Sequence, residues 1–192
     1  MIQIRIQRYN AMTKKQIYEY LKEKSIPYKA VEHEAVFTVE QARSLNLPNP
    51  EAGAKNLFLC DAPKRNFYLL TVRDTLPVRI NEFREKIGSK RLSFASEEDL
   101  FRIMNLMKGS VTPFGVINDD ACIVKVYFDN FFKGKIISVH PNDNTATVYL
   151  KCDDLVKLIH EHGNPVEYFH FLNTSPKRYQ NQMLFSHTKA LR

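Results

Sequence analysis

The sequence lacks the signatures of several enzyme classes. It contains no GxxxxGK[ST] or GxGxxG loop for binding nucleotide phosphates and no GxSxG turn for presenting a nucleophilic serine. No apolar run approaches the ~20 residues that a membrane-spanning helix needs. The first residues, MIQIRIQRYNAM, alternate apolar and polar side chains and contain no continuous apolar stretch of a signal peptide. We therefore expect a cytoplasmic protein with no membrane partner.

Cysteine is scarce, and no metal-ligand spacing occurs. Cys60, Cys122 and Cys152 lie far apart without a CxxC pair, which argues against a disulfide framework and fits a reducing compartment. We expect these cysteines to be small buried apolar residues. His160 and His162 are separated by one residue, whereas a helical zinc pair needs positions i and i+4. The sequence therefore indicates no metal site.

Acidic residues are fewer than basic ones. The 192 residues, enough for one domain with a hydrophobic core, include 28 Lys and Arg against 21 Asp and Glu, a net charge of +7. A basic surface suggests a polyanionic partner such as nucleic acid. A solvated basic face is an equally good explanation of the charge alone.

Turn and capping signals predict short helices mixed with strands at hairpin spacing. Capping boxes at Thr13 and Thr38 open helices that end before Pro27 and Pro48. Further helices are expected over 81–87, from Ser96, and over 153–162, and strands over 28–33, 56–61, 66–72, 91–94, 122–128, 135–139, 145–150 and 166–171. This order predicts an α+β fold with a mixed, largely antiparallel sheet flanked by helices. We expect an N-terminal extension (1–11), one domain (12–172) and a basic C-terminal tail (173–192).

Three places in this predicted fold could carry chemistry. The loop GSVTPFG at 109–115 combines glycine freedom with a fixed proline, so its backbone N–H groups could form an anion-binding concavity. It is equally consistent with a structural turn feeding a strand at Val116. Lys55 precedes an apolar strand and could meet a carboxylate, phosphate or ester oxygen, or simply extend from the strand end into solvent. His140 ends a strand and could exchange protons or serve only as a hydrogen-bond donor.

These places, in this order and spacing, resemble the YbaK/prolyl-tRNA synthetase-associated editing domains. The resemblance runs from about residue 13 to 171 and is closest to the free-standing ProX-type members that deacylate Ala-tRNA(Pro). The matching segments are HEAVFT at 33–38, KNLF at 55–58, GSKRLSFA at 88–95, GSVTPFG at 109–115, HP at 140–141 and NTAT at 144–147.

The resemblance implies a sheet curled toward a barrel and a hydrolase that proofreads mischarged tRNA(Pro). It implies no metal or other cofactor and no covalent intermediate, with prolyl-tRNA synthetase as a candidate further partner. It assigns catalysis to Lys55, Gly109 and His140. It assigns substrate binding to Phe37, Thr38, Asn56, Ser110, Val111, Thr112 and Pro113. It assigns contact with tRNA phosphates to Lys90 and Arg91.

Three alternatives stay open at the level of sequence. The same chemistry could act on Cys-tRNA(Pro), as in the YbaK-type deacylases, because pocket size decides between the two acyl groups. A tRNA-binding or regulatory relative without turnover would keep the fold and lose the reaction. A plain nucleic-acid-binding α+β domain would bind RNA without hydrolysing it.

Overall fold

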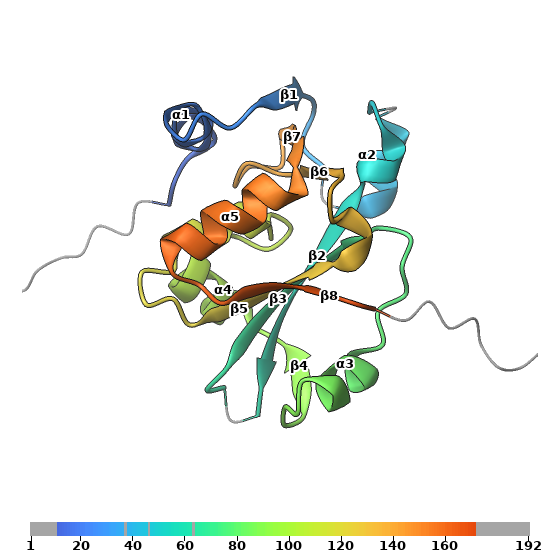
Figure 1. Ribbon diagram of the computed structural model, residues 1–192, viewed down its shortest axis with the longest axis vertical. Coiled ribbons are helices and arrows are strands. Elements are labelled where there is room, and N and C mark those ends of the chain that lie inside the picture. Colours follow the sequence, from blue (N-terminus) through green and yellow to red (C-terminus); the bar gives the residue numbers. More distant parts are fainter. Residues whose placement is uncertain (1–10, 37, 46, 63, 172–192) are drawn as a thin grey trace, which may run out of the picture.

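Two β-sheets carry the fold, and helices cover them (Figure 1). The computed structural model describes residues 11–36, 38–45, 47–62 and 64–171. Helices span α1 (Lys14–Glu23), α2 (Val39–Ser44), α3 (Ile80–Lys86), α4 (Glu97–Met104) and α5 (Cys152–His162), with 3-10 helices η1 (Pro50–Ala52), η2 (Pro113–Asn118) and η3 (Asn130–Phe132). Strands span β1 (Tyr28–Glu32), β2 (Ala54–Asp61), β3 (Phe67–Arg73), β4 (Leu92–Phe94), β5 (Val124–Asp129), β6 (Ile136–Val139), β7 (Ala146–Lys151) and β8 (Val166–Phe169).

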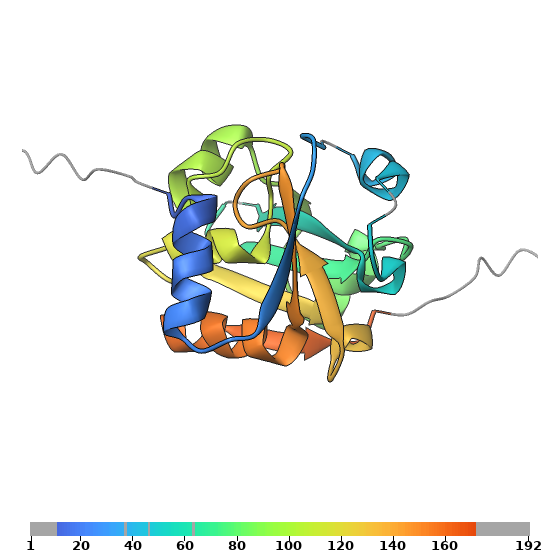
Figure 2. The same cartoon turned by 90° about the horizontal axis from the view of Figure 1, so that it is seen from above.

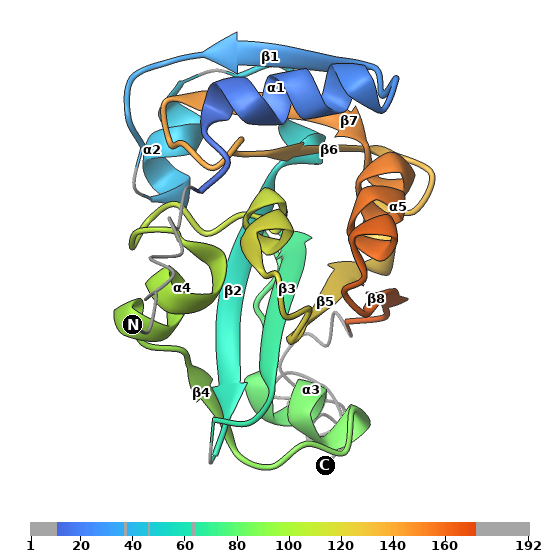
Figure 3. The same cartoon turned by 90° about the vertical axis from the view of Figure 1, so that its left-hand side faces the viewer.

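The smaller sheet has the order β1-β7-β6 and is antiparallel throughout. Figure 3 shows it across one end of the molecule, with β2 and β3 running away from it toward α3 and β4. Seen from above, α1 and α2 lie on opposite sides of β1 (Figure 2). The smaller sheet therefore has one side covered by α1 and another approached by α2.

The larger sheet has the order β4-β2-β3-β5-β8. Strand β2 pairs antiparallel with β3 and β4, whereas β3-β5 and β5-β8 are parallel pairs. A single parallel bridge between Gly53 and Ser138 joins the two sheets. The predicted α+β class with mixed, largely antiparallel pairing is confirmed.

Both predicted capping boxes are present. Thr13 and Gln16 each accept a hydrogen bond from the other's backbone N–H, which starts α1 and lets Ile17 and Leu21 face the core with no exposed surface. Thr38 and Gln41 exchange the same two bonds at 3.2 Å at the start of α2.

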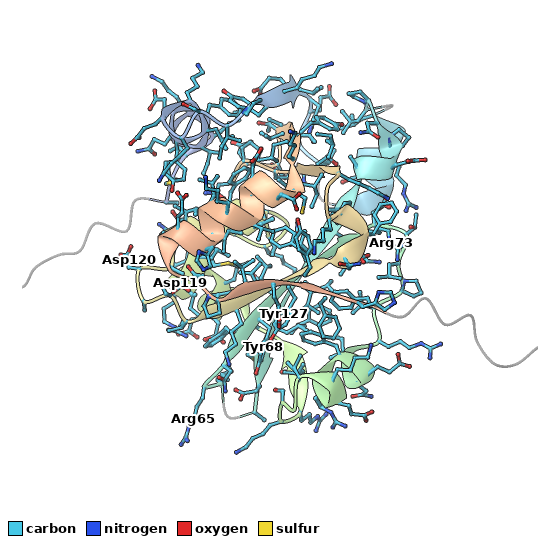
Figure 4. The ribbon with its side chains drawn as sticks, in the orientation of Figure 1. Arg65, Tyr68, Arg73, Asp119, Asp120 and Tyr127 are labelled. Carbon is cyan, nitrogen blue, oxygen red and sulfur yellow. The ribbon has the colours of Figure 1, made fainter. Side chains whose placement is uncertain are left out.

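The larger sheet is buried on both faces. On one face Leu69 and Phe128 join a core formed with α1, α4 and α5. On the other face Leu70 packs beneath α3 with Phe83 and Tyr127. Tyr127 and Tyr68 lie together in this second cluster (Figure 4). Burial on both faces explains why β3 is almost continuously apolar.

One local interpretation is corrected. No strand begins at Val116, because Pro113–Asn118 forms the buried 3-10 helix η2 and the next strand starts at Val124. Gly115 fixes this packing, since a Cβ there would collide with the Leu106 side chain.

The three cysteines are free thiols, with Cys60 and Cys152 buried and Cys122 half-buried. Within the described ranges, no helix is long and apolar enough to cross a membrane.

Candidate active-site cleft

A cleft of about 710 Å³ lies where the two sheets meet. Strands β6 and β7 form its floor, and the start of β2 forms one wall. The remaining walls come from Val36, Thr38, Arg43 and residues 47–50, from Asp74 and Thr75 after β3, and from the loop that follows α4. A cleft of this size falls in the usual range for small-molecule sites.

The register of the strands decides which side chains reach the cleft. In β7, Thr147 and Tyr149 line the cleft, and Val148 between them is fully buried in the core. Tyr149 is paired with Ser138 of β6, and Ser138 bridges to Gly53 at the start of β2. The bridge therefore places β2 beside the floor.

Lys55 enters the cleft from β2 and is half-buried. Its Nζ donates to the backbone oxygen of Asp74 at 3.1 Å, which leaves further N–H donors for a ligand oxygen. Burial lowers the pKa of Lys55, and the nearby Asp74 carboxylate acts in the opposite direction. That carboxylate pairs with Arg43 of α2, with 2.9 Å between Nε and Oδ2.

The loop after α4 contributes backbone to the cleft through Gly109 and Val111. Gly109 has a φ of +87°, a conformation that favours glycine. Within the described residues, the N–H groups of Gly109 and Val111 donate no hydrogen bond. The N–H of Ser110 is used, since it donates to the Met107 oxygen at 3.1 Å.

Asn56 fixes this loop from β2. Its Nδ2 donates to the Val111 carbonyl at 3.0 Å, and its Oδ1 accepts from the Thr71 hydroxyl at 2.8 Å. Thr71 is fully buried, so its bond fixes which way the amide points. The structure therefore makes Asn56 a tether between the strand and the loop.

His140 lies beyond the end of β6 with its ring in the cleft wall. Its Nδ1 donates to the Ala146 carbonyl at 3.0 Å, so Nε2 of the neutral ring is a hydrogen-bond acceptor. Burial lowers the pKa of His140, although the bond to Ala146 opposes this shift. The ring contacts His33 edge-on at 6.3 Å between centroids.

The remaining predicted substrate residues take different places. Thr38 lines the cleft, and Phe37 falls outside the described residues. Ser110, Thr112 and Pro113 do not line the cleft. The buried Thr112 hydroxyl instead donates to the His140 carbonyl at 2.6 Å and so connects the loop to β6.

Lys90 and Arg91 lie away from the cleft. The Arg91 carbonyl accepts from the N–H of Ala62 just past the far end of β2. Asp61, the last residue of β2, is six residues beyond Lys55, which corresponds to about 20 Å of strand. Figure 3 shows this end of β2 opposite the smaller sheet.

Sequence reasoning missed several cleft residues. Tyr149 and Thr147 come from β7, whose sequence alternates apolar residues with residues that carry a polar group, a signal that marks a face without identifying a site. Asp74 and Arg43 come together only through tertiary structure. In the part of the chain that the structure describes, no group of three His, Cys, Asp or Glu side chains is arranged to hold a metal ion.

Comparisons with known proteins agree on one family. A family model described as "Aminoacyl-tRNA editing domain" matches residues 33–158. The chain is 41% identical over 152 residues to the "Prolyl-tRNA editing protein ProX" of Acetoanaerobium sticklandii, covering 79% of this chain and 93% of that protein. It is 30% identical over 144 residues to "Prolyl-tRNA synthetase associated domain-containing protein 1" of Mus musculus, covering 73% and 85%. A solved structure of a candidate trans-editing enzyme for prolyl tRNA synthetase has the same fold, with a TM-score of 0.65, 16% identity and coverage of 84% and 97%.

Proposed function

Because the chain belongs to the family of aminoacyl-tRNA editing domains, we propose that its cleft hydrolyses the ester of mischarged Ala-tRNA(Pro) in trans. Family membership confirms the expected resemblance and the expected class of enzyme, an aminoacyl-tRNA deacylase. The observation that carries the proposal is the convergence of Lys55, the 109–111 loop and His140 on one cleft, although they are dispersed along the chain.

Discrimination by size gives such an enzyme its purpose. A synthetase site built for proline cannot strongly reject a smaller amino acid, because a missing methylene changes binding by only about 1–3 kcal/mol. A second cleft that admits alanine and excludes proline hydrolyses the error after it is made. Val36 and Val111 supply apolar surface to the cleft, and we place the acyl group between them and His140.

The reaction needs oriented water and stabilised negative charge. An aminoacyl ester is already activated, so the enzyme contributes position and electrostatics. The unpaired N–H groups of Gly109 and Val111 would bind the carbonyl oxygen as it becomes an oxyanion. Lys55 would bind an oxygen of the ester or the terminal ribose, and Nε2 of His140 would accept a hydrogen bond from the water or the substrate.

The substrate also defines the partners and the compartment. The basic surface would contact tRNA phosphates, which position the RNA without reading its sequence. Lys90 and Arg91, about 20 Å from Lys55, would then contact the tRNA body at a distance from its 3′ end. We place the reaction in the cytoplasm, with prolyl-tRNA synthetase as the enzyme whose errors it corrects.

Single-turnover deacylation of Ala-, Cys- and Pro-tRNA(Pro) tests this function. Fast release of alanine with intact Pro-tRNA(Pro) is the expected result. Faster release of cysteine than alanine would assign the protein to Cys-tRNA(Pro) editing. Tight binding of all three tRNAs without release would make it a binding protein and contradict the proposal.

A further inference from the structure

Tyr149 presents a hydroxyl to the cleft that none of the roles above uses. The residue lies on β7 directly opposite Ser138, and its side chain lines the cleft while leaving only 8% of its surface exposed. Burial raises its pKa, so the phenol stays protonated and can both donate and accept a hydrogen bond.

The neighbouring hydroxyls on the cleft floor already have partners. Ser138 donates to the Ala52 carbonyl at 3.1 Å, and Thr147 bonds His33 Nε2 at 3.0 Å. The Tyr149 hydroxyl makes no hydrogen bond to any described residue, and its oxygen keeps some contact with solvent. It is therefore open to a partner from outside the chain.

The strand register places Tyr149 two residues along the strands from the proposed acyl site beside His140. Ser138 precedes His140 by two residues, so Tyr149 is displaced from His140 by about 7 Å along the strands. On the opposite wall Lys55 reaches back to Asp74, and the Asp74 N–H bonds the carbonyl of Gly53. Gly53 is bridged to Ser138, so the amine of Lys55 and the hydroxyl of Tyr149 flank the same stretch of cleft.

A ligand whose acyl group lies beside His140 must extend its nucleoside into that stretch. Resting on the function proposed above, we propose that the Tyr149 hydroxyl hydrogen-bonds the free 2′-hydroxyl of the terminal ribose, next to the 3′ ester. A ribose hydroxyl both donates and accepts, as the phenol does, whereas Lys55 only donates. Because the 2′-hydroxyl distinguishes RNA from DNA, Tyr149 makes the cleft selective for a ribose terminus.

The test uses two non-hydrolysable ligands that differ in one hydroxyl. Both are tRNA(Pro) with alanine joined by an amide to the 3′ position of the terminal adenosine. One retains the 2′-hydroxyl and the other is 2′-deoxy. Filter binding gives the Kd of each ligand for the wild type, Tyr149→Phe and the control Tyr127→Phe.

Tyr149→Phe should weaken binding of the 2′-hydroxyl ligand by about tenfold and leave the 2′-deoxy ligand unchanged. Tyr127→Phe should change neither Kd, because Tyr127 is equally buried at 8% exposure and packs in the separate cluster around Phe83. Thermal unfolding of both variants checks that the fold is retained.

Each other outcome overturns a defined part of the account. Equal weakening of both ligands would place the Tyr149 contact on another part of the substrate and refute the ribose contact. No weakening of either ligand would remove Tyr149 from binding altogether, while the proposed function would stand. Failure of the wild type to bind either tRNA would overturn the proposed function together with this inference.

Discussion

Replacing Asn56 with alanine should lower the stability of the fold and also slow deacylation, because Asn56 holds the 109–111 loop in place. The change leaves the Thr71 hydroxyl, which has no exposed surface, without its acceptor. It also leaves the half-buried Val111 carbonyl without its donor. A buried polar group that loses its partner costs about 1–3 kcal/mol, and water can reach Val111, so the total should be about 2–3 kcal/mol.

For a domain of this length, each kcal/mol corresponds to about 2–4 °C in Tm, so Tm should fall by about 4–12 °C. Single-turnover deacylation well below that Tm should slow by about tenfold or more, because Gly109 and Val111 no longer hold their N–H groups in place. Asn66→Ala is the matched control. Its amide donates to Asp61 at 2.7 Å at the far hairpin, so this change should lower stability and preserve the rate.

A wild-type rate in Asn56→Ala, together with the expected loss of stability, would refute the reasoning. Asn56 would then stabilise the fold alone, and catalysis would not depend on the tethered loop. Equal slowing in Asn66→Ala would show that the assay reports stability rather than loop position.

Two further changes test the loop and the histidine. Gly109→Ala should slow deacylation at least tenfold, because φ of +87° disfavours a side chain and relief of that strain would displace the N–H groups of Gly109 and Val111. Gly134→Ala carries similar strain at φ of +72° in open space, so it should lower stability and leave the rate intact; equal rates in the two variants would refute the role of Gly109. For His140, burial lowers the folded-state pKa, so the unfolded chain binds the proton first as the pH falls below about 6.5. The free energy of unfolding, measured with urea across pH, should therefore decrease below that pH, and His140→Gln should reduce this acid loss; an identical pH dependence in the variant would exclude His140 as its source.

Local signals in the sequence predicted most of the elements, because the interactions that start and end them are local. Thr13 and Thr38 cap their helices through residues three positions away. Gly163 ends α5 at φ of +113°, where glycine is favoured. The 3-10 helix at Pro113–Asn118 was not predicted, because the apolar run there resembles a strand and its packing against Leu106 is a tertiary contact.

The site could be predicted only as separate pieces. The resemblance named Lys55, Gly109 and His140, and the structure places all three along one cleft; their catalytic roles stay predictions. Asn56 lines the cleft and bonds Val111, 55 residues away in sequence; its contact with substrate stays a prediction. Tyr149 carries no motif, and only its register opposite Ser138 places it in the cleft.

The central claim is that this cleft hydrolyses the ester and that Lys55 contacts the reacting end of the substrate. The most direct measurement is single-turnover deacylation of Ala-tRNA(Pro) by Lys55→Ala, with Lys90→Ala as the control distant from the cleft. We expect a loss of about a hundredfold or more for Lys55→Ala and a change below about threefold for Lys90→Ala, which would remove a single exposed phosphate contact. A loss below about threefold for Lys55→Ala would return this lysine to a structural role and contradict the account.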